Sequence, residues 1–251
     1  MKLHLFASAA VAAAAFAVPA FAADAVGSVG LSAAHTELEV GPFDGQGEAY
    51  TLDGSVAFQT APNWTVSLAG AVVTSDEDLG DDSTFSGMAH LTYAAADWRL
   101  GGFVGAGEAS DETLWSVGGV AQKYIGNVTL SGAVGYGKID DLDADLWGAR
   151  ADVRYFVSDT FSLNGGLGLT RIDVAGGDAD VWSIGAGGEY QFAGTPWSIF
   201  GGYEHNDAND LDLTADTVKL GVRVNFGGDL KARDRSGADL GAVSGLFGGV
   251  R

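Results

Sequence analysis

Two pairs of residues have the types and spacing of a hydrolytic site. Ser86 and His90 stand four residues apart in an alternating segment, which places a nucleophile and a base on one face of a strand. Asp152 and Glu189 could supply the two carboxylates of a general acid and a general base. Carboxylates among basic residues are more often ion-pair partners, and the Ser86–His90 face points to the interior. We therefore predict no catalytic residue and no enzyme activity.

One acidic stretch has the alternation of a calcium loop. Asp141, Asp143 and Asp145 occupy every second position of "DDLDADL". An EF-hand loop needs Gly at its sixth position, where this chain has Leu146. The chain also has no Cys, which excludes disulfides and thiolate metal sites. We predict no metal site and no cofactor, and interpret the stretch as a solvated acidic surface.

Other charged residues alternate with apolar ones, as in strands that have one polar and one apolar face. In "TVKLGVRVNF", residues 217–226, Lys219 and Arg223 lie between apolar positions. Related units, such as "NWTVSLAGAV" and "LWGARADVRYF", recur at spacings of 30 to 36 residues, two segments to a unit. With a first strand near residues 26–38 the count is twelve. An even number is typical of a single-chain antiparallel barrel.

Connections and aromatic residues show the same asymmetry along the chain. Short turns such as "IGN" and "VSDT" alternate with longer acidic segments such as "SDEDLGDDS" and "NDANDLDLTAD". In four strands aromatic residues mark both ends at a spacing of eight, as in Trp147 with Tyr155. Trp115 and Tyr124 are nine apart, which indicates either a bulge or a different register.

These features predict an all-β fold, an antiparallel transmembrane β-barrel of about 12 strands, with short periplasmic turns and longer acidic extracellular loops. Soluble sandwiches, lipocalin-like barrels and propellers share the alternation but have no reason to carry two aromatic girdles. Residues 1–22 have the basic start, apolar core and small-residue ending of a cleaved signal peptide. We divide the chain into this signal peptide, a barrel over residues 23–226 and a C-terminal periplasmic tail over residues 227–251.

On these strands, girdles and the Phe-ended last strand, residues 24–226 resemble the porin-like superfamily of Gram-negative outer-membrane β-barrels. The resemblance implies location in the cell outer membrane and folding by an assembly machinery that recognises the last strand. That role would fall on Val218, Leu220, Val222, Val224 and Phe226. The chain departs from the pattern because 25 residues follow Phe226.

Strand parity assigns a set of charged residues to the barrel interior. The predicted pore-lining residues are Asp53, His90, Arg99, Arg150, Asp152, Arg154, Glu189, Glu204, Lys219 and Arg223. Lys123 would join them only if Tyr124 faced lipid. Many small residues share this face, so we predict a narrow channel for small polar solutes or ions, with a weak cation preference. The alternative is a closed structural or adhesive barrel whose interior charges form ion pairs.

The outer surface has predicted partners of its own. Lys138, Arg171 and His205 have outward parity near the long-loop ends, where they could contact phosphates of lipid and lipopolysaccharide, or extend to the interface. The formal net charge of -20 excludes nucleic acid as a partner. For the tail we consider three alternatives: a flexible extension, a plug inside the lumen, or a contact with the cell wall or a periplasmic protein.

Overall fold

The computed structural model describes five stretches of the chain: residues 25–75, 83–109, 112–139, 143–174 and 177–246. The predicted signal peptide, residues 1–22, lies outside the described residues, as does Asp141 of the acidic stretch.

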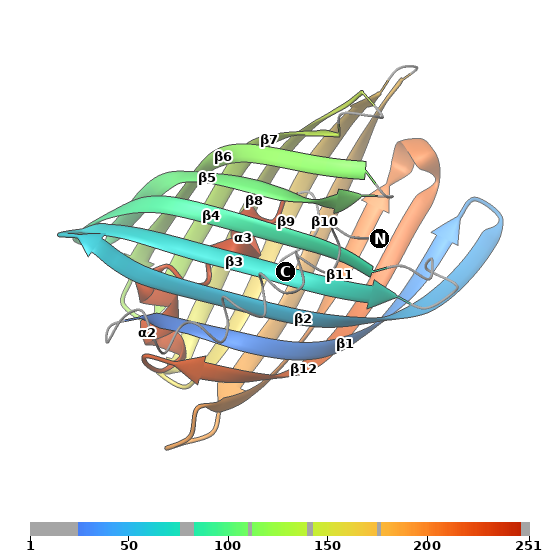
Figure 1. Ribbon diagram of the computed structural model, residues 1–251. Coiled ribbons are helices and arrows are strands. Elements are labelled where there is room, and N and C mark those ends of the chain that lie inside the picture. Colours follow the sequence, from blue (N-terminus) through green and yellow to red (C-terminus); the bar gives the residue numbers. More distant parts are fainter. Residues whose placement is uncertain (1–24, 76–82, 110–111, 140–142, 175–176, 247–251) are drawn as a thin grey trace.

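Twelve antiparallel strands close into one barrel (Figure 1). They are β1 (Val26–Val40), β2 (Phe43–Ala61), β3 (Trp64–Ser75), β4 (Ser83–Ala95), β5 (Trp98–Ala109), β6 (Glu112–Ile125), β7 (Val128–Ile139), β8 (Ala144–Ser158), β9 (Phe161–Val174), β10 (Gly177–Gln191), β11 (Trp197–Ala208) and β12 (Leu213–Phe226). Each strand pairs with its neighbours in sequence. β1 also pairs with β12, from Gly27 opposite Phe226 to Val40 opposite Leu213. The predicted strand count and the closing strand that contains "TVKLGVRVNF" are confirmed.

Side-chain alternation gives the barrel two chemically different faces. Large apolar residues project outward, and Leu220, Val134 and Leu167 keep 69%, 62% and 61% of their surface exposed. The inward positions of β3 are small and buried, as at Ser67 and Ala71. The outer face therefore suits lipid, while the inner face leaves room for other groups.

Several segments predicted as long loops continue the strands instead. Only Gly41 and Pro42 separate β1 from β2, so this connection is a two-residue turn. Between β11 and β12 only residues 209–212 intervene, and the 3₁₀ helix η2 (Asn209–Leu211) occupies three of them. The reason is that apolar alternation ends where the membrane band ends, whereas backbone pairing continues beyond it.

The register of β6 shows which of Lys123 and Tyr124 faces the interior, a point that the sequence alone did not decide. β6 pairs with β5 and β7 without a bulge, so Trp115 and Tyr124 lie on opposite faces. The Tyr124 hydroxyl accepts a hydrogen bond from Arg99 Nε at 3.1 Å, on the inside. Lys123 lies outside, where its ammonium group pairs with Asp97 and lies 4.5 Å from the centre of the Trp98 ring.

After β12 the chain turns back into the barrel. Gly227 has a φ of 77°, a conformation that favours glycine, and two short helices follow, α2 (Leu230–Ser236) and α3 (Leu240–Ser244) (Figure 1). Asp229 caps α2 by accepting a hydrogen bond from the amide of Ala232 at 2.8 Å. Among the described residues, no helix is long and apolar enough to cross a membrane.

Candidate functional site: the barrel lumen and its C-terminal segment

Inside the barrel lies a cavity of about 330 Å³ with a strongly charged lining. Eight of the ten predicted pore-lining residues border it: Asp53, Arg150, Asp152, Arg154, Glu189, Glu204, Lys219 and Arg223. The other two, His90 and Arg99, are buried and contact the segment that follows β12. All ten therefore face the interior.

The segment over residues 229–246, which we name the C-terminal segment, lies within the barrel. Leu230, Arg233, Leu240 and Leu246 in it are each at most 4% exposed. Of the three alternatives for the tail, the described part corresponds to an insert in the lumen, because its helices contact barrel strands from inside. The predicted tail begins at the short-turn end of the barrel, where β12 ends.

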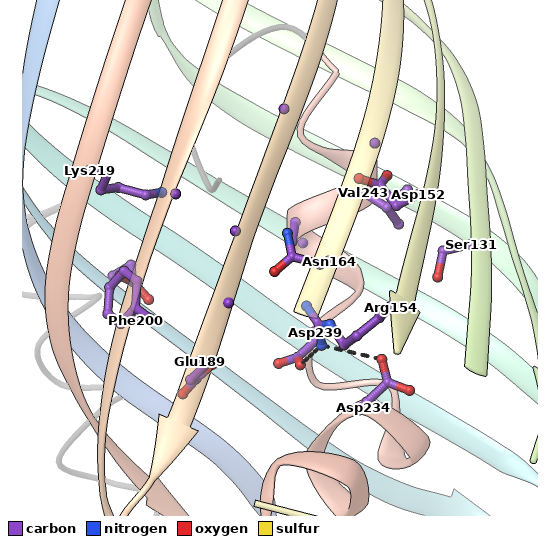
Figure 2. A pocket seen from close by; sticks show the side chains of 18 of the residues that line it. Ser131, Asp152, Arg154, Asn164, Glu189, Phe200, Lys219, Asp234, Asp239 and Val243 are labelled. Carbon is purple, nitrogen blue, oxygen red and sulfur yellow. Dashed lines mark hydrogen bonds and ion pairs between the residues drawn. The ribbon is translucent and has the colours of Figure 1, made fainter. Parts of the chain in front are cut away.

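An ion-pair network joins α2 to the wall formed by β8, β10 and β12. The Arg233 guanidinium donates to Glu189 at 2.5 Å and, through Nε, to Asp239 at 2.8 Å. Arg154 on β8 lies between Asp239 and Asp234, with Nη1 3.3 Å from Asp234 (Figure 2). Each of these five residues therefore has a partner of opposite charge.

The network continues along the strands without the C-terminal segment. Arg223 on β12 reaches Asp53 at 2.9 Å and Glu189 at 3.3 Å. Its guanidinium carbon lies 4.2 Å from the centre of the Phe200 ring. Burial of so many charges is favourable only when each is paired and hydrogen-bonded. The arrangement therefore fixes the C-terminal segment in a specific position.

Ionisation of the buried groups follows from these neighbours. Burial raises the pKa of Asp234 despite the nearby Arg154. Burial alone would also raise the pKa of Asp239, but the guanidinium groups of Arg233 and Arg154 outweigh it and lower that pKa. In the same way Asp239 and Glu189 outweigh burial and raise the pKa of Arg233.

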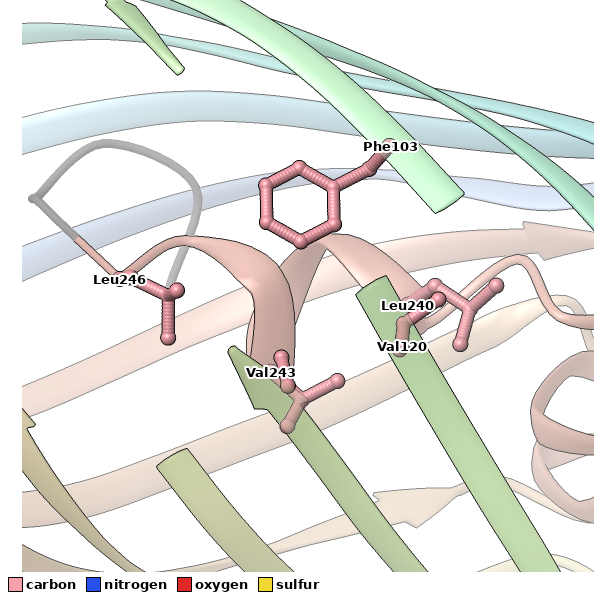
Figure 3. Packing of buried hydrophobic residues seen from close by; sticks show 6 residues of the cluster. Phe103, Val120, Leu240, Val243 and Leu246 are labelled. Carbon is pink, nitrogen blue, oxygen red and sulfur yellow. The ribbon is translucent and has the colours of Figure 1, made fainter. Parts of the chain in front are cut away.

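Apolar packing anchors α3 against strands β3 and β6 to β8. Leu240, Val243 and Leu246 form one buried cluster with Phe103, Val120 and Ala133 of strands β5 to β7 (Figure 3). The wall makes room by having no side chain at Gly135, because a Cβ there would lie 3.0 Å from Leu246 Cδ1. The cluster is a small apolar core inside the barrel.

Two predicted interior residues lie beneath the C-terminal segment. His90 Nε2 and Ser244 Oγ are 2.6 Å apart, so His90 bonds to α3 rather than to Ser86 of its own strand. Ser244 Oγ also donates to the Leu240 carbonyl at 2.7 Å and is 1% exposed. Both residues of this pair are at most 2% exposed. Arg99 donates to the Arg235 carbonyl at 2.8 Å and to Thr92 Oγ1 at 2.9 Å.

The predicted lipid-facing cations have acidic neighbours on the outside. Lys138 lies 3.0 Å from Asp143. Arg171 is half exposed and pairs with Asp178, and His205 Nδ1 lies 2.8 Å from Asp216. These partners reduce the positive charge that a lipid phosphate would meet, so phosphate contact stays a prediction.

The predicted assembly signal occupies the outer face of β12. Val218, Leu220 and Val222 are 59%, 69% and 46% exposed. Val224 and Phe226 are half-buried, and a Cβ on Gly27 of β1 would lie 2.6 Å from the Phe226 ring. An outward apolar row is present, and its recognition by assembly machinery stays a prediction.

Sequence reasoning did not identify the charged residues of the C-terminal segment. Arg233, Asp234 and Asp239 are the groups that meet the lumen charges. A signal was available, since Asp229 and Gly237 flank α2 as cap residues.

No protein-family model and no curated protein sequence matches this chain. Solved structures do match. An outer membrane channel from Pseudomonas putida F1 is 16% identical, with a TM-score of 0.56, over 80% of this chain and 96% of that one. The NanC porin is 11% identical, with a TM-score of 0.55, over 77% and 98%. The translocator domain of the autotransporter NalP from Neisseria meningitidis is 16% identical, with a TM-score of 0.52, over 87% and 94%. At these identities the likeness establishes the fold, which is that of outer-membrane β-barrels.

Proposed function

We propose that this protein is an outer-membrane, porin-like channel through which small polar solutes or ions diffuse passively. The observation that carries the proposal is the cavity inside the barrel, which is lined by charged side chains instead of a closed apolar core. Solved structures with this fold include porins and channels, and also an autotransporter translocator domain. The C-terminal segment occupies part of the lumen, so the passage is narrow.

The proposal includes a weak preference for cations. The cavity lining contains five basic side chains and six acidic ones among the described residues: Arg150, Arg154, Lys219, Arg223 and Arg233 against Asp53, Asp152, Glu189, Glu204, Asp234 and Asp239. Acidic residues are also numerous in the sequence near the long-loop ends. Charge at the mouth and in the lumen sets ion preference in pores.

The protein would reach the cell outer membrane through its signal peptide and the outer-membrane assembly machinery. There its outer face would contact lipid and lipopolysaccharide. We assign it no enzymatic role, because His90 is buried and bonded to Ser244 and not to Ser86, and Asp152 is held in an ion pair with Arg150 at 3.1 Å.

A closed structural or adhesive barrel is the second candidate. It is favoured by the ion pairs of Arg233 with Glu189 and of Arg154 with Asp234, which hold the C-terminal segment inside the lumen. The two candidates differ in conductance. If the protein is a channel, the purified protein in a planar lipid bilayer gives discrete current steps. In a salt gradient the reversal potential then shifts toward the equilibrium potential of the cation. If no current steps appear at any protein concentration, the channel proposal is wrong and the closed barrel is the remaining candidate.

A further inference from the structure

The C-terminal segment contributes charge to the cavity as well as volume. Arg233, Asp234 and Asp239 from this segment all line the cavity, together with eight charged residues of the strands. Those eight strand residues are evenly divided, four basic and four acidic. The segment's own contribution of one base and two acids therefore gives the lining its acidic excess.

The same segment also removes a positive charge from the lumen. Arg99 is 4% exposed, and among the described residues its hydrogen bonds go to uncharged oxygens of Arg235, Thr92 and Tyr124. A Cβ on Gly237 would lie 3.1 Å from the Arg99 guanidinium, so the chain passes directly over it. Without the segment this cation would face the water of the pore.

The position of the segment is well defined at both ends. Leu240 is 0% exposed in the apolar cluster, and Arg233 is 2% exposed in the ion-pair network. Its acidic groups are therefore held at fixed places beside the cavity, where charged side chains influence ion preference.

From these observations we propose that the C-terminal segment is the selectivity element of the channel. In this inference, which rests on the proposed function, Asp239 and Asp234 favour cations in the cavity while the backbone over Arg99 hides a charge that would favour anions. The barrel without the segment is a wider passage lined by five basic and four acidic residues of the strands, and it prefers anions.

The test uses single-channel recording in a planar bilayer with a potassium chloride gradient. The proteins are the full mature chain, a deletion of residues 228–251, Asp239→Asn, and Asp97→Asn as a matched control. Asp97 lies in an exposed short turn and pairs with the outward-facing Lys123, so its substitution removes an equal charge away from the lumen.

We expect the deletion to give larger current steps and a reversal potential shifted toward the chloride equilibrium potential. Asp239→Asn should shift it in the same direction by a smaller amount, and Asp97→Asn should leave it unchanged. Larger steps with an unaltered reversal potential would overturn the inference and leave the channel function intact. Silence from both the full chain and the deletion would instead remove the proposed function itself.

The deletion needs a check that the barrel still forms, which heat-dependent mobility on a denaturing gel provides. Should it fail to assemble, Asp239→Asn decides the question in the intact barrel. A reversal potential identical to that of the unmodified chain would then refute the selectivity role.

Discussion

The two helices of the C-terminal segment are held in the same lumen by different chemistry. α3 packs on β3, β6, β7 and β8, and its Leu240 lies in an apolar cluster. α2 presents Arg233 and Asp234 to charged residues on β8 and β10. The apolar contact tolerates small shifts, because the hydrophobic effect has no direction, whereas buried ion pairs require every partner in place. The apolar contacts of α3 therefore stabilise the C-terminal segment in the lumen, and the ion pairs of α2 fix where it lies.

This division is best tested with a reporter of docking. The chain has no Cys, so Ala238→Cys, at a site 1% exposed between the two helices, introduces a unique thiol. Its rate of reaction with a charged thiol reagent measures how often the C-terminal segment leaves its site. Each variant is compared in this Ala238→Cys background.

The largest effect is expected from Arg233→Met. Loss of the guanidinium leaves Glu189 and Asp239 buried with fewer partners, which costs about 3–5 kcal/mol. Labelling should accelerate by roughly 150-fold or more, since about 1.4 kcal/mol corresponds to a factor of ten. Arg171→Met, on the outside of the barrel, is the control. Equal labelling rates in the two variants would mean that the network does not hold α2.

Leu240→Ala should have a comparable or slightly smaller effect. Truncation of a buried leucine costs about 2–5 kcal/mol through lost transfer energy and the cavity it leaves. We expect labelling faster by roughly 30-fold or more. The control is Leu220→Ala, the same change at a position that is 69% exposed on the outer face. A labelling rate that stays at the control value would contradict α3 as the apolar anchor.

Asp234→Asn should act in the opposite direction at neutral pH. The pKa of Asp234 is raised by burial above its ordinary value of 3.8, so ionisation of this carboxyl weakens docking. Its contribution to docking is complete below that ordinary value and is lost as pH rises through the raised pKa. The amide keeps an acceptor for the Thr129 hydroxyl, so labelling at pH 7 should slow, and the difference should vanish below about pH 3.8. Faster labelling at pH 7 would show that the charge of Asp234 is needed.

The smallest effect is expected from Lys231→Ala at the rim of the barrel. Its ammonium group lies 3.3 Å from Asp159, whose side chain is 64% exposed. Exposed pairs contribute about 0.2–1 kcal/mol and are screened by salt. Labelling should therefore increase by less than roughly tenfold, and the difference should disappear in 1 M salt. An effect as large as that of Arg233→Met would mean that the exposed ion pair at the rim contributes as much to docking as the buried network does.

Much of the fold follows from periodicity in the sequence, because each strand must face lipid on one side. Lys219 and Arg223 alternate with exposed valine and leucine, and this alone fixes the face of β12. Trp115 and Tyr124 could not be placed in this way, since an aromatic ring suits either the lipid interface or a buried hydrogen bond. Only the pairing of β6 with both neighbours separates them.

The C-terminal segment was less predictable for a physical reason. Its helices have seven and five residues, too short to produce a clear helical period. Its partners, such as Glu189 and Phe103, come from strands far away in sequence. Their convergence depends on barrel closure, so charge complementarity between them is visible only in three dimensions.

The backbone turn at Gly227 has a consequence for the order of events during folding. The surface that receives the C-terminal segment includes β1, β3 and β6 to β9 as well as Glu189 on β10, so it is complete only after β12 has joined β1. Contacts between such distant parts of a chain form slowly, because loop-closure entropy is lost before they are made. We therefore expect the C-terminal segment to insert after the strands of the barrel have paired.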